Sequence, residues 1–383
     1  MFETKNNIAK IGCTPSIRSP KISQATANDC GNVCENVCSG ENLMTTFKKN
    51  QLMKPKATLK KISDTLQISI STVSRALKDH PDISDNTKQK VMELAELMEY
   101  EPNTYAINLR TNTSKVFSIM VPAISNLFYH SFISAVEEEA RLHGYSLMVL
   151  QSGDSPVIEI ANLKLCRQNR VAGIFVSVTS ATNSIQPFLK MNEIDVPVIF
   201  FDKVPDFEAC NKVCVADTAA ATIAATTLIH KRKKNILAIF GNPKMSITKK
   251  RLEAFTKTIK VKSKTIKSKT EFATTPEEAM RSIHKNFKYA KTYDAIFCMS
   301  DEILTGVMKA VQQLNLKIPK DVSVIAISNG FIPQLYYPEI SYVETSGYKL
   351  GKLAYTRMMA CLAGSTFAQE LIVESVFVEG GSL

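Results

Sequence analysis

The stretch ATLKKISDTLQISISTVSRALKD, residues 57–79, decides how the amino-terminal part of this chain folds. Its apolar residues recur every three or four positions in two short runs, which the tight segment 66–69 separates. This period places apolar side chains on one face of a helix. Thr58 and Ser69 stand where a polar residue caps each helix, and Ser84 precedes a third periodic run that we expect to end near Tyr100, because Pro102 disfavours helix before it. The stretch therefore predicts three short helices around one small core, the first two in helix-turn-helix spacing.

The second predicted helix carries its polar residues on one face, at Ser71, Ser74, Arg75 and Lys78. Short hydroxyls permit close approach to a duplex, and a guanidinium can donate two hydrogen bonds to guanine O6 and N7. The alternative is a solvated face in an ordinary helical bundle. The pattern alone leaves both interpretations open.

The length of 383 residues is enough for two or three domains of about 100–200 residues each. Hydrophobic residues make up 45% and charged residues 22%, which excludes collagen-like and wholly disordered chains. No window approaches the roughly 18 apolar residues of a membrane span, and the first 30 residues lack the layout of a secretory signal. We therefore expect a cytoplasmic protein without a membrane partner, whose nine cysteines are free thiols.

Residues 1–52 show no apolar period and are rich in Ser, Thr, Asn and Lys, so we predict a disordered extension there. Cys30, Cys34 and Cys38 would align on a helix, but their spacing does not match the familiar zinc patterns. We favour Met53 or Met44 as the natural start.

From Lys115 onward, short apolar runs alternate with helical patterns. The runs are VFSIMV, SLMVL, AGIFVSV and PVIFF, and after Asp217 come NILAIF, DAIFC and DVSVIAI. They are apolar throughout, as expected for parallel strands that are buried on both faces. The order predicts an α/β core of two doubly wound lobes, whose ligand lies in the cleft at the carboxyl ends of the strands.

The net charge of +11 is local. Between Lys231 and Lys269 there are 14 basic residues and one acid, Glu253, so the remainder of the chain sums to −2. The stretch could bind DNA, an anionic effector or a partner. Because HKRKK and VKSKTIKSK each precede a predicted strand, where surface loops fall, we interpret it as solvated surface.

Several motifs together resemble the LacI/GalR family of bacterial transcription regulators: STVSRAL, ISDNTKQKV, EYEPN and NLRTNTSK. The resemblance continues through SIMVPAISNLFY, PVIFFDK, CMSDEILTG and YKLGKLA, and covers the chain from about Ala57 to the last strand. It implies a helix-turn-helix DNA-binding domain over 53–102, a hinge helix over 103–114 and a two-lobed core over 115–383 that resembles periplasmic binding proteins. It further implies a homodimer that binds double-stranded operator DNA and a small effector, which we expect to be a sugar or a derivative.

The predicted DNA-contacting residues lie in two groups. Ile70, Ser71 and Arg75 match the family's base-reading positions, and an apolar Ile70 either contacts a thymine methyl or packs inward. Leu109 matches the leucine that wedges into the minor groove, and Ile107 replaces an arginine common in the family. The full predicted set is Thr58, Ser69, Ile70, Ser71, Thr72, Ser74, Arg75, Asn103, Ala106, Leu109 and Arg110.

The predicted effector-binding residues are carried across from the resemblance one position at a time: Asn126, Phe128, Asp202, Arg251, Ser300, Asp301, Ser328 and Asn329. Asp301 has an alternative role as the cap of the helix that it begins. Ser328 and Asn329 stand where the family often has an aspartate, so Asn329 or Asp202 must take the role of that aspartate, or the ligand differs.

Enzyme motifs are absent from the sequence: it has no P-loop, no H-E-x-x-H and no G-x-S-x-G. The five histidines form no metal pattern, and Cys210 and Cys214 suit burial as small hydrophobes. We expect a transcription regulator, of the repressor kind, without enzymatic activity, cofactor or metal. The rival is a cytosolic small-molecule binding module that lacks specific DNA recognition.

Overall fold

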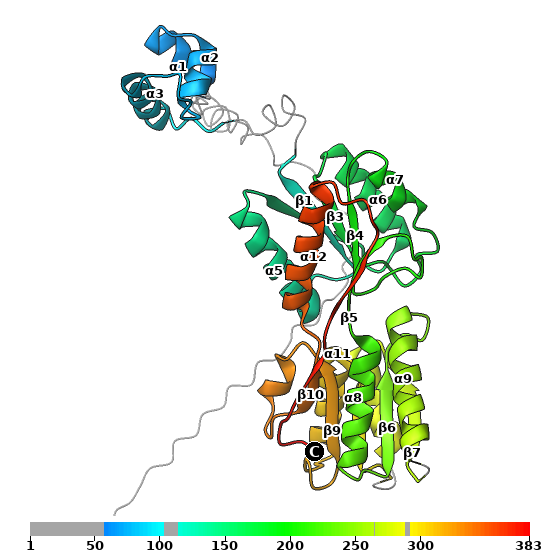
Figure 1. Ribbon diagram of the computed structural model, residues 1–383. Helices are drawn as coiled ribbons and strands as arrows, with labels where there is room; N and C mark the ends of the chain where they lie inside the picture. Colours follow the sequence, from blue (N-terminus) through cyan, green and yellow to red (C-terminus); the bar gives the residue numbers. More distant parts are fainter. Residues whose placement is uncertain (1–56, 103–113, 264, 288–291) are drawn as a thin grey trace, which may run out of the picture. The chain divides into compact units, whose positions relative to one another are not determined.

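The computed structural model describes residues 57–102, 114–263, 265–287 and 292–383 (Figure 1). Contacts divide the chain at Pro102 into an amino-terminal helical unit and a larger core. The extension predicted over 1–52 and most of the predicted hinge, 103–113, lie outside the described residues. The domain boundaries given above stay predictions.

The helical unit contains α1 (Leu59–Leu66), α2 (Ile70–Ala76) and α3 (Asp85–Leu97). Each helix begins at its predicted cap: the hydroxyl oxygens of Thr58, Ser69 and Ser84 accept from backbone N–H groups at 3.2, 3.0 and 3.4 Å. The predicted apolar faces meet in one small core, whose buried members are Ile62, Val73, Ala76, Val91 and Ala95. The three-helix prediction is therefore confirmed.

The end of α3 differs from the prediction, because the helix stops at Leu97 rather than near Tyr100. Glu99 takes a left-handed conformation with φ of 49°. The N–H of Tyr100 then donates to the carbonyl of Ala95 at 2.8 Å, and the N–H of Glu99 donates to Glu96. This pair of bonds closes a Schellman motif, so local capping ends the helix before Pro102 can act.

The first lobe of the core is built on a parallel sheet in the order β11-β5-β4-β3-β1-β2. Its strands are β1 (Val116–Val121), β2 (Ser146–Gln151), β3 (Gly173–Val176), β4 (Val198–Phe201), β5 (Asn211–Val215) and β11 (Glu370–Val373). Phe117 and Ile119 of β1 pack in the same cluster as α5 (Leu127–Leu142) and α12 (Gly347–Leu362). Met120 packs in a second cluster with α6 (Pro156–Gln168) and α7 (Gln186–Asn192). Helices on both faces explain why the strands are apolar throughout.

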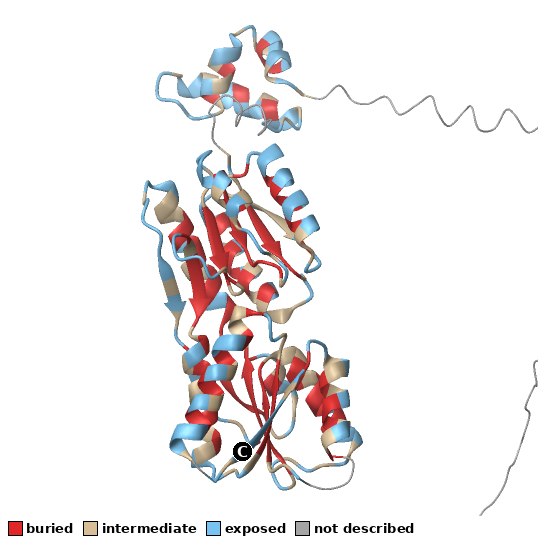
Figure 2. Ribbon diagram, turned by 90° about the vertical axis from the view of Figure 1, so that its right-hand side faces the viewer, coloured by how far each residue is buried: buried red, intermediate tan, exposed pale blue. Residues whose placement is uncertain are grey.

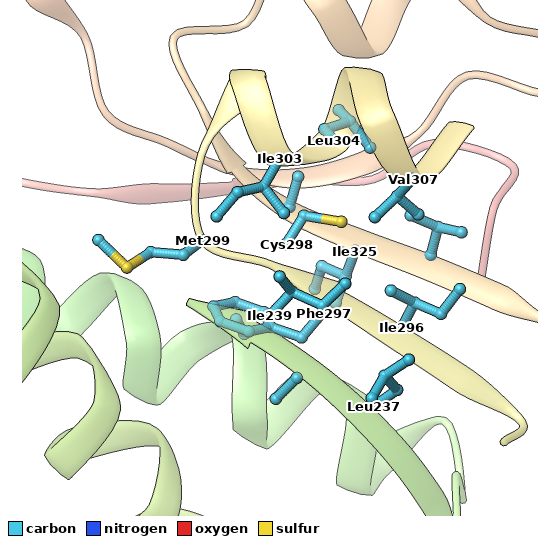
Figure 3. Close-up of a cluster of buried hydrophobic side chains, with 14 of the residues drawn as sticks. Leu237, Ile239, Ile296, Phe297, Cys298, Met299, Ile303, Leu304, Val307 and Ile325 are labelled. Atoms are coloured by element: carbon cyan, nitrogen blue, oxygen red, sulfur yellow. The ribbon is translucent and has the colours of Figure 1, made fainter. Parts of the chain in front are cut away.

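The second lobe has a sheet in the order β12-β10-β9-β8-β6-β7. Its strands are β6 (Asn235–Phe240), β7 (Lys267–Phe272), β8 (Ala295–Cys298), β9 (Ser323–Ser328), β10 (Ser341–Glu344) and β12 (Val376–Val378). The helices are α8 (Asp217–His230), α9 (Ser246–Lys262), α10 (Pro276–Phe287) and α11 (Asp301–Gln313), with a short 3-10 helix, η1 (Ile332–Leu335). Figure 2 shows that buried residues concentrate in the strands of both lobes, and Figure 3 shows α11 laying Ile303, Leu304 and Val307 over β8.

The doubly wound α/β prediction is confirmed, with two corrections. β12 pairs antiparallel with β10, so the second sheet is not wholly parallel. The stretch VKSKTIKSK is not a plain surface loop: it ends α9 and begins β7, an exposed strand at the edge of the sheet.

The chain described from residue 114 onward passes between the lobes three times, whereas the sequence predicts lobes that simply follow one another. It crosses at residue 216, again at 345–346 and last at 374–375, between β11 and β12. As a result, α12 and β11 complete the first lobe although they follow the second lobe in sequence.

Candidate functional site

The outer face of α2 presents the predicted base-reading side chains. Ile70 is 46% exposed, so it does not pack inward, and Ser71 and Arg75 are exposed beside it. Val73 and Ala76 lie on the opposite face, fully buried against α1 and α3. The buried face of α2 therefore fixes the helix, and Ile70, Ser71 and Arg75 lie on its exposed face.

The remaining predicted residues of this unit have local roles in the structure. Ser69 Oγ accepts from the N–H of Thr72 and lies 2.7 Å from Ser71 Oγ. Thr58 caps α1 in the same way, and Ser74 is half-buried. These hydroxyls hold the helix ends and remain proposed DNA contacts. The predicted hinge residues lie outside the described part of the chain: Asn103, Ala106, Ile107, Leu109 and Arg110.

A cavity of about 640 Å³ lies between the two lobes of the core. Its walls are the residues that follow the carboxyl ends of strands in both sheets, among them β1 and β4 in the first lobe and β6, β8 and β9 in the second. All eight predicted effector residues line it: Asn126, Phe128, Asp202, Arg251, Ser300, Asp301, Ser328 and Asn329. Carboxyl ends of parallel strands are where such folds bind ligands.

Arg251 is fixed at the cavity wall by three hydrogen bonds. Its Nε and Nη2 contact Asp217 Oδ1 at 2.8 and 2.7 Å, and its Nη1 donates to the carbonyl oxygen of Met299 at 2.8 Å. Both members of the ion pair are buried, at 5% and 7% exposed. A guanidinium has five N–H groups, so two remain for a ligand in the cavity. Figure 3 shows Met299 at one end of the hydrophobic cluster to which it belongs, and it also lines the cavity.

Asp202 follows β4 and takes a left-handed conformation with φ of 56°. The hydroxyl of Tyr129 donates to its Oδ2 at 2.8 Å and lies 3.0 Å from Ser177 Oγ. Burial raises the pKa of the Asp202 carboxyl to about 6. Among the described residues none donates to Asp202 Oδ1, so this oxygen can accept from a ligand hydroxyl.

Asp301 does not cap α11, because Ser300 is the cap and accepts from the N–H of Ile303. The carboxylate of Asp301 instead accepts from Ser328 Oγ at 2.5 Å and from the N–H of Asn329 at 3.0 Å. Burial raises its pKa to about 6 despite these bonds. Asp301 and Ser328 thus fix the loop after β9, and the capping alternative is wrong.

Two asparagines join the lobes across the cavity. Asn126 Nδ2 donates to Glu302 Oε1 at 2.5 Å, and Asn329 Nδ2 donates to Ser131 Oγ at 2.7 Å. Asn329 Oδ1 also accepts from the N–H of Gly347 at 2.8 Å. Both the nitrogen and the oxygen of the Asn329 amide are therefore hydrogen-bonded within the protein. Asp202 is better placed than Asn329 to take the role of the aspartate that is common in the family.

Sequence reasoning missed Tyr129 and Glu302, which line the cavity as well. Tyr129 lies on the apolar face of α5, where a core tyrosine looks the same in sequence, and its partner Asp202 is 73 positions away. Glu302 adjoins Asp301, and this adjacency is the one local signal that could have found it. The charged lining comprises four carboxylates and two cations: Asp154, Asp202, Asp301, Glu302, Lys203 and Arg251.

Metal ligands, membrane-spanning helices and cysteines are the other features on which the sequence allows predictions. Within the described ranges, no three His, Cys, Asp or Glu side chains gather as metal ligands would, and no helix is long and apolar enough to cross a membrane. Five cysteines are free thiols, as predicted, and Cys210 and Cys214 are buried. The other four, at positions 13, 30, 34 and 38, lie outside the described residues.

Two family models match the chain. The model for periplasmic binding proteins and the sugar-binding domain of the LacI family matches residues 114–376. The model for bacterial regulatory proteins of the lacI family matches residues 58–103. The two matches together span both described units.

Known proteins resemble this chain over most of its length. The transcriptional repressor PurR of Vibrio vulnificus (strain CMCP6) is 24% identical over 301 residues, which are 78% of this chain and 90% of PurR. The lac repressor dimer bound to operator and the anti-inducer ONPF has a similar fold, with a TM-score of 0.76 and 17% identity over 85% of this chain and 99% of that one. A periplasmic binding protein/LacI transcriptional regulator from Alkaliphilus metalliredigens QYMF, complexed with D-xylulofuranose, also has a similar fold. The match covers 70% of this chain and 99% of that one, with a TM-score of 0.61 and 23% identity.

Proposed function

The chain belongs to the LacI family of bacterial transcriptional regulators, and from this premise we propose that it is a homodimeric repressor whose operator affinity is set by a small ligand held between its lobes. In this proposal residues 53–102 bind DNA, 103–114 form the hinge and 115–383 bind effector and dimerise. The protein acts in the cytoplasm and carries no enzymatic activity.

The observation that carries the proposal is the cavity to which both lobes contribute. A ligand there contacts Asp202 of the first lobe and Arg251 of the second at once, so its binding depends on the angle between the lobes. The same angle sets the lengths of the Asn126–Glu302 and Asn329–Ser131 hydrogen bonds. Ligand and DNA binding are then coupled through one conformational equilibrium.

The ligand that suits this lining is an uncharged polyhydroxyl compound, such as a sugar. Asp202 Oδ1 offers an acceptor and Arg251 offers donors, which fits neighbouring hydroxyls. Four carboxylates against two cations oppose a phosphate or carboxylate ligand. The D-xylulofuranose complex of the related regulator supports the same class.

The test is selection of genomic DNA fragments by the purified chain at near-physiological salt, since non-specific affinity falls steeply with salt. We expect a shared pseudo-palindrome, because a two-fold dimer requires matching half-sites. The Arg75→Ala variant should lose about 1–3 kcal/mol at one base pair of the half-site and relax specificity there. Lys90→Ala, on the exposed surface of α3, is the matched control.

Failure to enrich any site, with or without metabolite extract as a source of corepressor, would favour the binding-module alternative. Unchanged discrimination among operator variants by Arg75→Ala would remove that residue from base reading.

A further inference from the structure

A shallow groove lies between α9 and β7 of the second lobe. These two elements lie at one edge of that lobe (Figure 1). Its floor is apolar and is made by Leu252, Val261 and Phe272. Val261 is 76% exposed and Phe272 is 44% exposed, so water covers this floor in the isolated chain. Three lysines of α9, Lys249, Lys257 and Lys260, also line this α9–β7 groove.

The groove borders a free sheet edge. Among the strands of the described residues, β7 is the terminal one in its sheet and pairs with β6 alone. The N–H of Lys267 donates to the carbonyl of Lys234, just before β6, and the N–H of Ala273 donates to that of Phe240 in β6, each at 2.8 Å. In a parallel ladder alternate residues bond to the same neighbour. The N–H and C=O groups of the even positions, among them Thr270, therefore point away from the sheet.

The lysine charges of the groove are not neutralised by acidic side chains of the described residues. Among the described residues, Lys249, Lys257 and Lys260 have no acidic partner within ion-pair distance, and Glu253 is the one acid in the lining. The surrounding stretch from Lys231 to Lys269 has 14 basic residues and one acid, a net charge of +13, whereas the whole chain has +11. An occupant would therefore be favoured by negative charge.

We propose that the α9–β7 groove docks an acidic, extended segment of a partner protein, which adds to β7 as a further strand. Outward backbone groups of β7 give the hydrogen bonds, the apolar floor receives alternate side chains, and the lysines pair with the acids of the segment. The apolar floor and the unpaired edge of β7 favour a peptide over DNA. DNA phosphates would gain nothing from an apolar surface or from strand pairing. Lys267 and Lys269 on β7 would repel the same strand of a second copy.

The experiment is selection of displayed random 12-residue peptides on the purified full-length chain and on two variants. Thr270→Pro removes one outward N–H, and leaves the ladder to β6 intact because proline is tolerated on edge strands. Lys257→Glu/Lys260→Glu reverses the charge of the rim at exposed positions. Thermal unfolding confirms that each variant folds, and fluorescence anisotropy with a synthetic copy of an enriched peptide gives the affinities.

We expect acidic peptides with apolar residues at alternate positions, and a loss of affinity of at least tenfold in each variant. Absence of such peptides, or equal binding by wild type and Thr270→Pro, would overturn the proposal. If the lysine variant weakens binding to a random 30-base-pair duplex and acidic peptides are not enriched, the surface binds DNA instead. If Thr270→Pro lowers the sedimentation mass of the free chain, the edge joins two copies instead. Both results would refute a partner strand, and neither bears on effector binding between the lobes.

Discussion

Replacement of Asp202 by asparagine should stabilise the folded core at pH 8 and have little effect at pH 4. The carboxyl lies at the end of β4, where Oδ2 accepts from the Tyr129 hydroxyl and where burial raises the pKa. Asparagine keeps an acceptor oxygen for Tyr129 and cannot ionise. The substitution therefore removes the destabilisation that the buried negative charge causes, while the hydrogen bond from Tyr129 remains.

The magnitude follows from the pKa difference between the folded and unfolded states. The pKa of Asp202 rises from its ordinary 3.8 to about 6. Because one pKa unit corresponds to about 1.4 kcal/mol, ionisation in the fold costs about 3 kcal/mol at pH 8. The folded state binds the proton more tightly, so this contribution destabilises above pH 6 and fades as the pH falls toward 4. At pH 4 it is about 0.5 kcal/mol.

Urea unfolding of the wild type and Asp202→Asn at both pH values measures this difference. Asp195→Asn is the matched control, because Asp195 is exposed and shares the left-handed conformation, with φ of 59°. Asparagine favours that conformation, and the control measures this separate gain. An equal gain at pH 4 and pH 8, or no gain at pH 8 beyond that of the control, would refute an electrostatic origin.

Three further substitutions test the packing. Arg251→Ala should lower the unfolding free energy by about 3–5 kcal/mol in urea, because Asp217 stays buried without its cation; an unchanged value would show that the pair is not coupled. Gly347→Ala should cost about 1–3 kcal/mol in the same assay, since a Cβ would lie 2.4 Å from the carbonyl oxygen of Phe128, and wild-type stability would contradict the close approach. Ser84→Ala should destabilise the helical unit by about 1 kcal/mol through the lost cap. Calorimetry should show a shift in the transition of that unit alone, and a shift in the core transition would argue against independent units.

The parts of the fold that the sequence predicts are those with a local signal. Ser69 and Ser84 cap helices through bonds to residues three positions on, so the polar residue and the period after it locate each helix. β7 escapes prediction because KSKTEF is an exposed edge with no apolar run. No predicted element covers α12, and β11 belongs to the first lobe only through its pairing with β5, which lies more than 150 positions earlier in the sequence.

In the candidate site, too, the sequence predicts positions that carry a local or family signal and misses contacts between distant segments. All eight residues that the resemblance predicts as effector-binding line the cavity, since family positions keep their place at strand ends. The resemblance does not show which of these side chains are already hydrogen-bonded to other residues of the protein. The bonds of Asp301 to Ser328 and of Asn329 to Ser131 join segments 27 and 198 positions apart, and no local pattern reveals them. Adjacent Ser300 and Asp301 are both able to cap, so the sequence cannot choose between them.

The late return of the chain to the first lobe has a consequence for its synthesis. When β1 to β5 have left the ribosome, this lobe still lacks α12, whose Leu350, Ala354 and Met358 belong to its hydrophobic core. One face of the nascent sheet therefore stays partly uncovered while some 130 further residues are translated. Chaperone binding should concentrate in that interval, and a stop codon near position 345 should leave a protein that is degraded although the strands β1 to β5 are complete.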